Sequence, residues 1–81
     1  MKHCVVAIKD LAVNGFQRPF VVPHRAMAAR SFIDEVKRAE SEMAKHREDY
    51  VLYELGSFDD DTGKFENIDP PELVIRAVDV A

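Results

Sequence analysis

Apolar positions near the start of the chain recur at every second residue. In the stretch 3–9, HCVVAIK, the side chains of Cys4, Val6 and Ile8 alternate with the other four, and Asp10 follows. This period is typical of a strand that rests one face on a core. The pattern predicts a first strand over residues 3–9, with Cys4, Val6 and Ile8 turned inward.

The segment 11–23 carries turn and edge-strand signals. Asn14-Gly15 is the strongest two-residue turn signal in the chain, so we expect a tight turn or a small β-excursion there. Pro19 lacks an N–H donor and suits the beginning of an edge strand, which continues over residues 20–22 until Pro23 ends it. Residues 20–22 should therefore lie at an edge of the sheet.

From Ala26 to about Met43 the apolar period changes to 3.6. One stripe of this segment is apolar, and the opposite side holds charged and polar side chains. The stripe consists of Ala29, Phe32, Ile33, Val36, Ala39 and Met43. We therefore expect one long amphipathic helix packed on the sheet, followed by a charged surface loop over residues 44–49, AKHRED.

A β-hairpin is predicted over residues 50–66. Val51, Tyr53 and Leu55 alternate with their neighbours in a run rich in β-branched and aromatic side chains, which is typical of a strand. The turn DDTG follows at 60–63, where an Asp can bond its own backbone and Gly63 can take a positive φ. Residues 64–66 should then run back beside residues 56–58.

The C-terminal segment 72–80 fits two structures. Asp69-Pro70-Pro71 ends strand pairing, and a proline at a first helical turn favours a short helix. The alternation of the apolar positions that follow favours a strand instead, and we favour the helix. The sequence thus predicts an α+β fold: a small antiparallel sheet of about four short strands, one long amphipathic helix on one face, and a short C-terminal helix or strand.

Length and composition indicate one soluble domain over residues 1–81. Hydrophobic residues make up 47% and charged residues 32% of the chain, which is ordinary for a globular protein. No apolar run approaches the roughly 18 residues that span a bilayer, and no signal-peptide pattern precedes the first strand. We therefore expect a cytoplasmic protein without a membrane partner, and one that gains buried area as a homo-oligomer.

The net charge of −4 hides an asymmetry along the chain. Residues 1–47 hold nine basic and five acidic groups, whereas residues 48–81 hold two basic and ten acidic groups. The first half is therefore cationic and the second half anionic. Binding of nucleic acid by such a chain requires that the fold keep the two apart in space, because phosphate is attracted by clustered Lys and Arg.

Neither catalysis nor metal binding is indicated. The chain lacks a nucleophile with a sequence-level partner, and its three glycines stand singly, so no phosphate loop is present and we expect no enzyme and no cofactor. The three histidines and Cys4 show no ligand pair at metal-site spacing, and the acidic turn at 59–61 lacks the spacing of a calcium loop. Cys4, the one cysteine, is expected to be a buried, inert thiol.

One stretch combines aromatic and basic side chains. Phe16, Arg18 and Phe20 occupy alternate positions, with Arg25 and Arg30 nearby. Aromatic rings give bases a surface on which to stack, and guanidinium groups hold phosphates, as in sequence-tolerant single-strand binders. In so short a chain, however, phenylalanines also serve to fill the core.

Several segments together resemble the small nonstructural protein of gokushovirus-type microviruses, which are single-stranded DNA phages. The matching segments are Arg18-Pro19-Phe20, Ala29-Arg30-Ser31-Phe32 with Asp34, Ala44-Lys45-His46 leading to Glu48-Asp49-Tyr50, the run from Leu52 to Gly63, and Pro70-Pro71 with Ala77 and Asp79. They cover nearly the whole chain, and their order and spacing are distinctive. Arg18 replaces the usual Gln, and His24 stands where a capping Asn is common.

This resemblance implies a protein made during infection, present in the host cytoplasm but absent from the virion, that acts on viral single-stranded DNA in replication or packaging. The family gives no established binding residue. From charge and aromaticity, the candidate DNA contacts are Arg18, Phe20, Arg25, Arg30, Lys37 and Arg38. The alternative function is a protein-interaction module that modulates a viral or host replication or packaging factor through the acidic second half.

Overall fold

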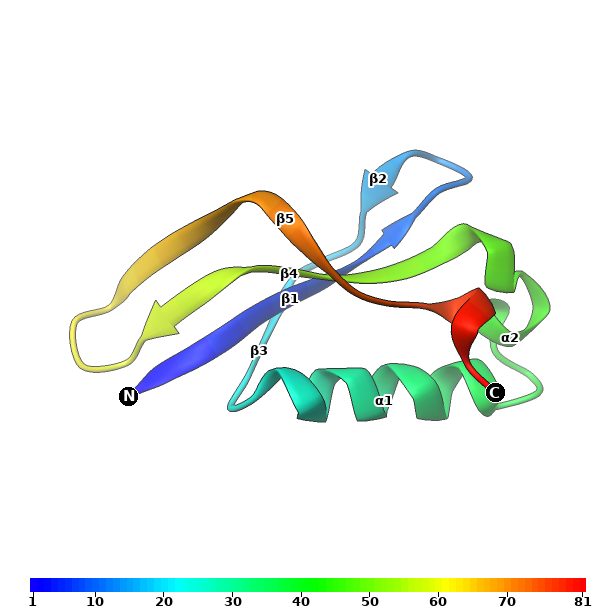
Figure 1. Ribbon diagram of the computed structural model, residues 1–81, viewed down its shortest axis with the longest axis horizontal. Helices are drawn as coiled ribbons and strands as arrows, with labels where there is room; N and C mark the ends of the chain where they lie inside the picture. The colour runs from blue at the N-terminus through cyan, green and yellow to red at the C-terminus, as the bar shows by residue number, and fades with distance from the viewer.

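The computed structural model describes all 81 residues as a small mixed α+β protein with a curled antiparallel sheet and one helix of several turns (Figure 1). The strands are β1 (Lys2–Asp10), β2 (Gly15–Phe16), β3 (Phe20–Val22), β4 (Tyr50–Asp59) and β5 (Lys64–Arg76). The helices are α1 (Arg25–Lys37) and the one-turn α2 (Glu42–Lys45), with 3₁₀ turns η1 (Arg47–Asp49) and η2 (Ala77–Asp79). No helix has the length and apolarity needed to cross a bilayer.

All strands are antiparallel, in the order β2-β1-β4-β5, and β3 pairs with the same strand, β1, as β2 does. The predicted small β-excursion at Asn14-Gly15 and the predicted edge strand over residues 20–22 are thus confirmed. Figure 1 shows α1 on one side of the sheet, while β2 and the bend of β5 rise on the other side. The molecule is elongated, 40 × 23 × 17 Å, and a three-stranded arm formed by β1, β4 and β5 extends past the start of α1.

The core lies between α1 and the sheet, and it accounts for the alternating apolar side chains of β1. Cys4 and Val6 are buried in it and Ile8 packs against it, as their alternation predicts. Phe32 and Val36 reach it from α1, and Leu52 reaches it from β4. Val5 and Ala7 on the opposite face of β1 are buried as well, because β1 is a central strand of a curled sheet.

The predicted long helix is shorter than its apolar stripe. It ends at Lys37, since Arg38 has extended backbone angles, and Ser41 begins α2 by accepting a hydrogen bond from the Ala44 N–H at 3.0 Å. The Ser41 hydroxyl also donates to the Glu35 carbonyl at 2.6 Å, which closes the corner between the helices. The expectation of a loop over residues 44–49 was wrong, because α2 and η1 occupy it.

The β4–β5 hairpin confirms the predicted register to within one residue. Phe58 pairs with Phe65, and Gly63 has φ of 75°. The carboxylate that accepts from the turn belongs to Asp59, which binds the Asp61 N–H at 2.9 Å. The turn chemistry was therefore assigned one residue too far along the chain.

The preference for a C-terminal helix was wrong. Pro70 and Pro71 lie in a stretch, 68–71, that has no partner on β4, but pairing resumes at Glu72 and continues to Arg76. The alternating apolar side chains decide the structure because Ile75 opposite Leu52 joins the core, which a short exposed helix would not achieve. Only one 3₁₀ turn, η2, follows.

Candidate nucleic-acid interface

Strand pairing divides the sheet into two faces with different chemistry. Residues directly opposite each other on paired strands point to the same face. The face that carries Cys4, Val6 and Ile8 lies against α1, and we call it the helix side. The other face carries Val5 and Ala7, and we call it the helix-free face.

Five carboxylates occupy paired positions of the sheet, and all five belong to rows of the helix side. They are Asp10 (with Tyr50), Glu54 and Glu72 (with Val6), Asp59 (with Lys2) and Glu66 (with Ser57 and Cys4). The rows of the helix-free face contain no carboxylate. The carboxylates at paired strand positions therefore lie on one side of the sheet, as binding of an anionic ligand on the other side requires.

Aromatic rings gather on the helix-free face in two pairs. Phe16 meets Tyr53 edge-on, with ring centroids 5.5 Å apart, and Phe58 lies beside Phe65 at 5.0 Å. The Phe16 side chain is 46% exposed and that of Phe65 65% exposed. Both rings thus present surface to solvent, and a flat ligand can stack on them.

The cationic end of this face lies at the row formed by Lys9, Val51 and Arg76. The Lys9 ammonium sits over the Phe16 ring, 5.5 Å from its centroid. Arg76 also binds Asp79, Nε to Oδ2 at 3.2 Å, on the surface, where such pairs are weak and readily exchanged. Lys9 is placed to meet a phosphate next to the Phe16 ring, and Arg76 lies at the other end of the same row, on β5.

A hollow of about 210 Å³ lies in the middle of the helix-free face. Val5, Pro19 and Leu55 give it apolar walls, and Phe65 and Asn67 of β5 border it. Its floor includes Gly56, where a Cβ atom would come within 2.0 Å of the Glu66 carbonyl oxygen. Only glycine permits this approach of β5 to β4.

The sequence-predicted candidates do not form one surface. Arg25 is engaged on the helix side: its Nη1 binds Glu72 at 2.6 Å and Glu54 at 3.2 Å, and its Nη2 donates to the Leu73 carbonyl at 3.1 Å. These partners raise the Arg25 pKa, with the hydrogen bond to Glu72 as the largest cause. Arg25 therefore fastens the start of α1 to the β4–β5 pair.

Arg38 is also paired. Its guanidinium makes two hydrogen bonds to the Glu35 carboxylate, at 2.7 and 3.1 Å, which hold the pKa of that carboxyl below its usual value. Arg18, Arg30 and Lys37 are exposed and form no ion pair. Arg30 and Lys37 share the outward face of α1, seven residues apart, with Asp34 between them.

The structure separates Phe16 from Phe20. Phe16 pairs with Lys9 and so lies on the helix-free face, whereas Phe20 pairs with Val6 and lies on the helix side. The register changes by one residue between β2 and β3, which reverses the direction of every following side chain. The regular alternation that placed Phe16, Arg18 and Phe20 together is therefore interrupted at residues 17–19.

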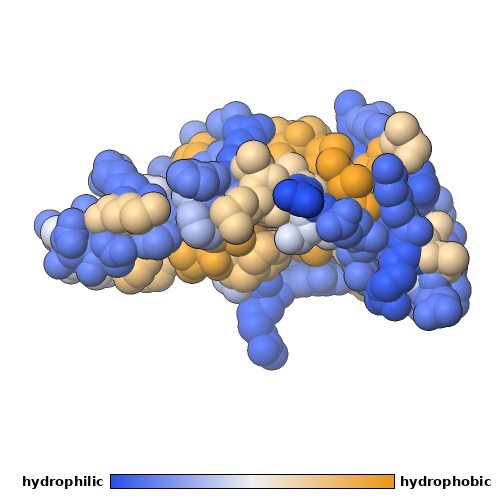
Figure 2. Space-filling model, turned by 90° about the horizontal axis from the view of Figure 1, so that it is seen from below, coloured by the Kyte–Doolittle hydropathy of each residue, from blue (hydrophilic) through white to orange (hydrophobic).

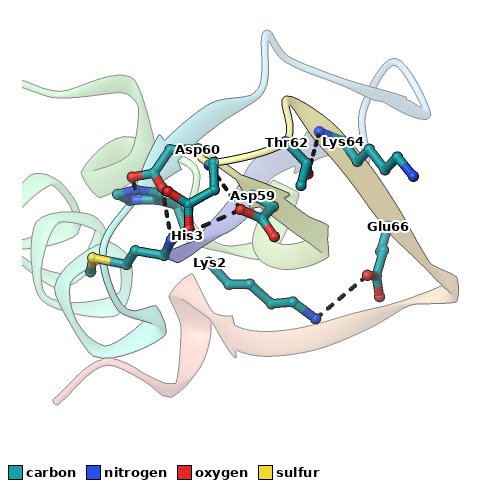
Figure 3. A network of polar contacts seen from close by, with 9 residues as sticks. Lys2, His3, Asp59, Asp60, Thr62, Lys64 and Glu66 are labelled. Atoms are coloured by element: carbon teal, nitrogen blue, oxygen red, sulfur yellow. Dashed lines mark hydrogen bonds and ion pairs between the residues drawn. The ribbon is translucent and has the colours of Figure 1, made fainter.

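An acidic tip, Asp59 to Asp61, ends the arm (Figure 3). The Met1 ammonium binds Asp60 at 2.8 Å and Asp61 at 3.0 Å, and His3 binds Asp60 at 2.7 Å. These hydrogen bonds, with that from the ammonium first, lower the Asp60 pKa. Seen from the helix side, the arm is mainly hydrophilic (Figure 2).

Cys4 lies in the core, and burial raises the pKa of its thiol to about 11, with a further contribution from Glu54. The thiol is thus protonated at neutral pH. This agrees with the prediction of a buried, unreactive cysteine.

Sequence reasoning missed Lys9, Tyr53, Phe58 and Phe65 as surface candidates. The signal was present in the period-two pattern, which puts Lys9 on the face opposite Ile8 and Tyr53 on the face opposite Leu52. Phe65 could be placed only through its partner Phe58, once the register of the hairpin was known.

The fold and this face define a small α+β protein with an exposed aromatic sheet surface. The chain belongs to the Phage ORF5 protein family, whose model matches residues 3–80, and it is therefore a small phage protein. Neither a curated protein nor a solved structure gives a significant match.

Proposed function

We propose that this phage protein binds single-stranded DNA, without catalysing a reaction, on the helix-free face of its sheet. One observation carries the proposal: the rows of that face hold four aromatic rings, Lys9 and Arg76, and no carboxylate. Bases stack on aromatic rings with about 1–3 kcal/mol each, and cations hold the phosphates between them.

The curled shape of the sheet also supports single-stranded DNA as the ligand. The two edges, β2 and the bend of β5, rise on either side of the helix-free face (Figure 1). A base that is not paired exposes both its faces and its edges to such a surface.

The resemblance to the nonstructural protein of gokushovirus-type microviruses agrees with this function. It adds the setting: the host cytoplasm during infection, and replication or packaging of a single-stranded genome. Two aromatic pairs and two cations make a weak site, so we expect a homo-oligomer in which linked sites gain avidity on one strand. A viral or host replication protein is the further partner that this role implies.

The proposal is tested by fluorescence anisotropy with a labelled dT12 strand at 20 and 200 mM salt. Phe65→Ala should weaken binding about 5-fold or more, because it removes the more exposed stacking ring. Lys9→Ala should weaken binding and reduce the salt slope by about 1. The matched controls lie on α1: Met27→Ala removes an exposed apolar side chain, and Lys37→Ala removes an unpaired cation.

The two control variants should bind as the unmodified protein does. If Lys37→Ala weakens binding and Phe65→Ala does not, DNA binds on the outward face of α1 and the location proposed here is wrong. If dT12 does not bind at 20 mM salt, the DNA function is refuted, and a protein partner becomes the better explanation of the exposed face.

A further inference from the structure

The hollow on the helix-free face is too small for a whole nucleotide chain or a drug-sized ligand. Pockets for such ligands span about 300–1,000 Å³, and this one measures about 210 Å³. It lies in the row of Val5, Gly56 and Asn67, directly beside the row of Phe58 and Phe65. A ligand in the hollow therefore contacts Phe65 at the same time.

The walls of the hollow suit one flat ring system. Val5, Pro19 and Leu55 offer apolar contact to the faces of a ring. Glu66 also borders the hollow, but it belongs to a helix-side row, and its carboxylate pairs with the Lys2 ammonium at 3.4 Å.

Asn67 supplies the polar group at the rim of the hollow. Its side chain is exposed on the helix-free face, opposite Gly56. An asparagine amide donates one hydrogen bond and accepts another, which matches the paired acceptor and donor on adenine. This pair is N7 and N6–H₂ on the major-groove edge of adenine; on the same edge thymine offers only the O4 acceptor beside its methyl group, and cytosine only the N4–H₂ donor.

We propose that this hollow holds one unstacked base of the bound strand, packed beside Phe65 and read by the Asn67 amide, with adenine preferred. The inference rests on the proposed function. It adds a position of base preference to a surface that otherwise binds any sequence.

The test compares dT11 with dT11 that carries one adenine at its centre, in the anisotropy assay at 20 mM salt. The unmodified protein should bind the adenine-containing strand at least about 3-fold more tightly. Asn67→Ala should bring the two affinities within about 1.5-fold of each other. Gln17→Ala, which removes an exposed amide next to α1 and outside the hollow, should keep the preference.

Circular dichroism and the thermal midpoint establish that each variant is folded. Equal binding of the two strands by the unmodified protein, or a preference that survives Asn67→Ala, refutes the base site while the proposed function stands. Failure of both strands to bind refutes both.

Discussion

Of the three glycines, Gly56 is the one at which an added methyl group would meet the closest contacts. A Cβ atom there would lie 2.0 Å from the Glu66 carbonyl oxygen, 3.0 Å from its carbon and 3.1 Å from the Asn67 Cα. All three atoms are backbone, so no side-chain rotation relieves the contact. In Gly56→Ala, β5 must therefore move by more than 1 Å, away from the strand with which it pairs.

The loss of stability in Gly56→Ala follows from the contacts that this movement breaks. Overpacking costs about 1–3 kcal/mol, and disturbing the pairing of Gly56 with Asn67 and of Ser57 with Glu66 adds about 1 kcal/mol per hydrogen bond. Alanine also has less conformational entropy than glycine in the unfolded chain, which offsets less than 1 kcal/mol of this loss in stability. We expect the free energy of unfolding to fall by about 3 kcal/mol, and the thermal midpoint by about 12–24 °C.

The assay is thermal and urea unfolding followed by circular dichroism, with Gly15→Ala as the matched control. A Cβ atom at Gly15 meets nothing closer than the Val13 carbonyl oxygen at 3.9 Å, and the φ of Gly15 is not positive. That variant should stay within about 0.5 kcal/mol of the unmodified protein. A midpoint for Gly56→Ala within 3 °C of the unmodified value would refute the close approach of β5 to β4.

Three further predictions concern charge and reactivity. Arg25→Ala should lower the free energy of unfolding by about 1 kcal/mol in urea, because it leaves half-buried Glu54 without its ion pair; an unchanged midpoint would show that Arg25 does not fasten α1. The Cys4 thiol, with its pKa raised to about 11, should react with a disulfide reagent at pH 8 about 100-fold more slowly in the folded than in the urea-unfolded protein; equal rates would contradict its burial. The pKa of Asp60 is lowered in the folded state, so its contribution to stability is complete above about pH 4 and is lost as the pH falls through the folded-state pKa. The stability difference between the unmodified protein and Asp60→Asn should therefore shrink in acid. A difference that grows in acid would refute the bonds from the N-terminal ammonium and His3.

Much of the fold follows from local pattern in the sequence. The period-two run before Asp10 and the turn at Gly63 are enough to predict β1 and the β4–β5 hairpin, because one buried face fixes the direction of each side chain. The end of α1 was not predictable in this way. The apolar stripe continues to Met43, but that side chain reaches the core from the separate helix α2.

The candidate site depended on two irregularities that no single-residue signal reveals. The register change between β2 and β3 turns Phe20 to the helix side, and the bulge at Leu55 keeps Glu54 on that same side. The charge asymmetry of the two halves of the chain was visible in sequence, but its direction in space was not. Only the paired register shows that the strand carboxylates share one face.

The most direct test of the DNA-binding account is a two-dimensional ¹⁵N–¹H NMR titration of the protein with dT12. The account predicts that the largest amide shifts map to Lys9, Phe16, Tyr53, Phe65 and Asn67, while Arg30 and Lys37 on α1 stay unperturbed. Shifts confined to the outward face of α1, or no shifts at millimolar DNA in 20 mM salt, would contradict it.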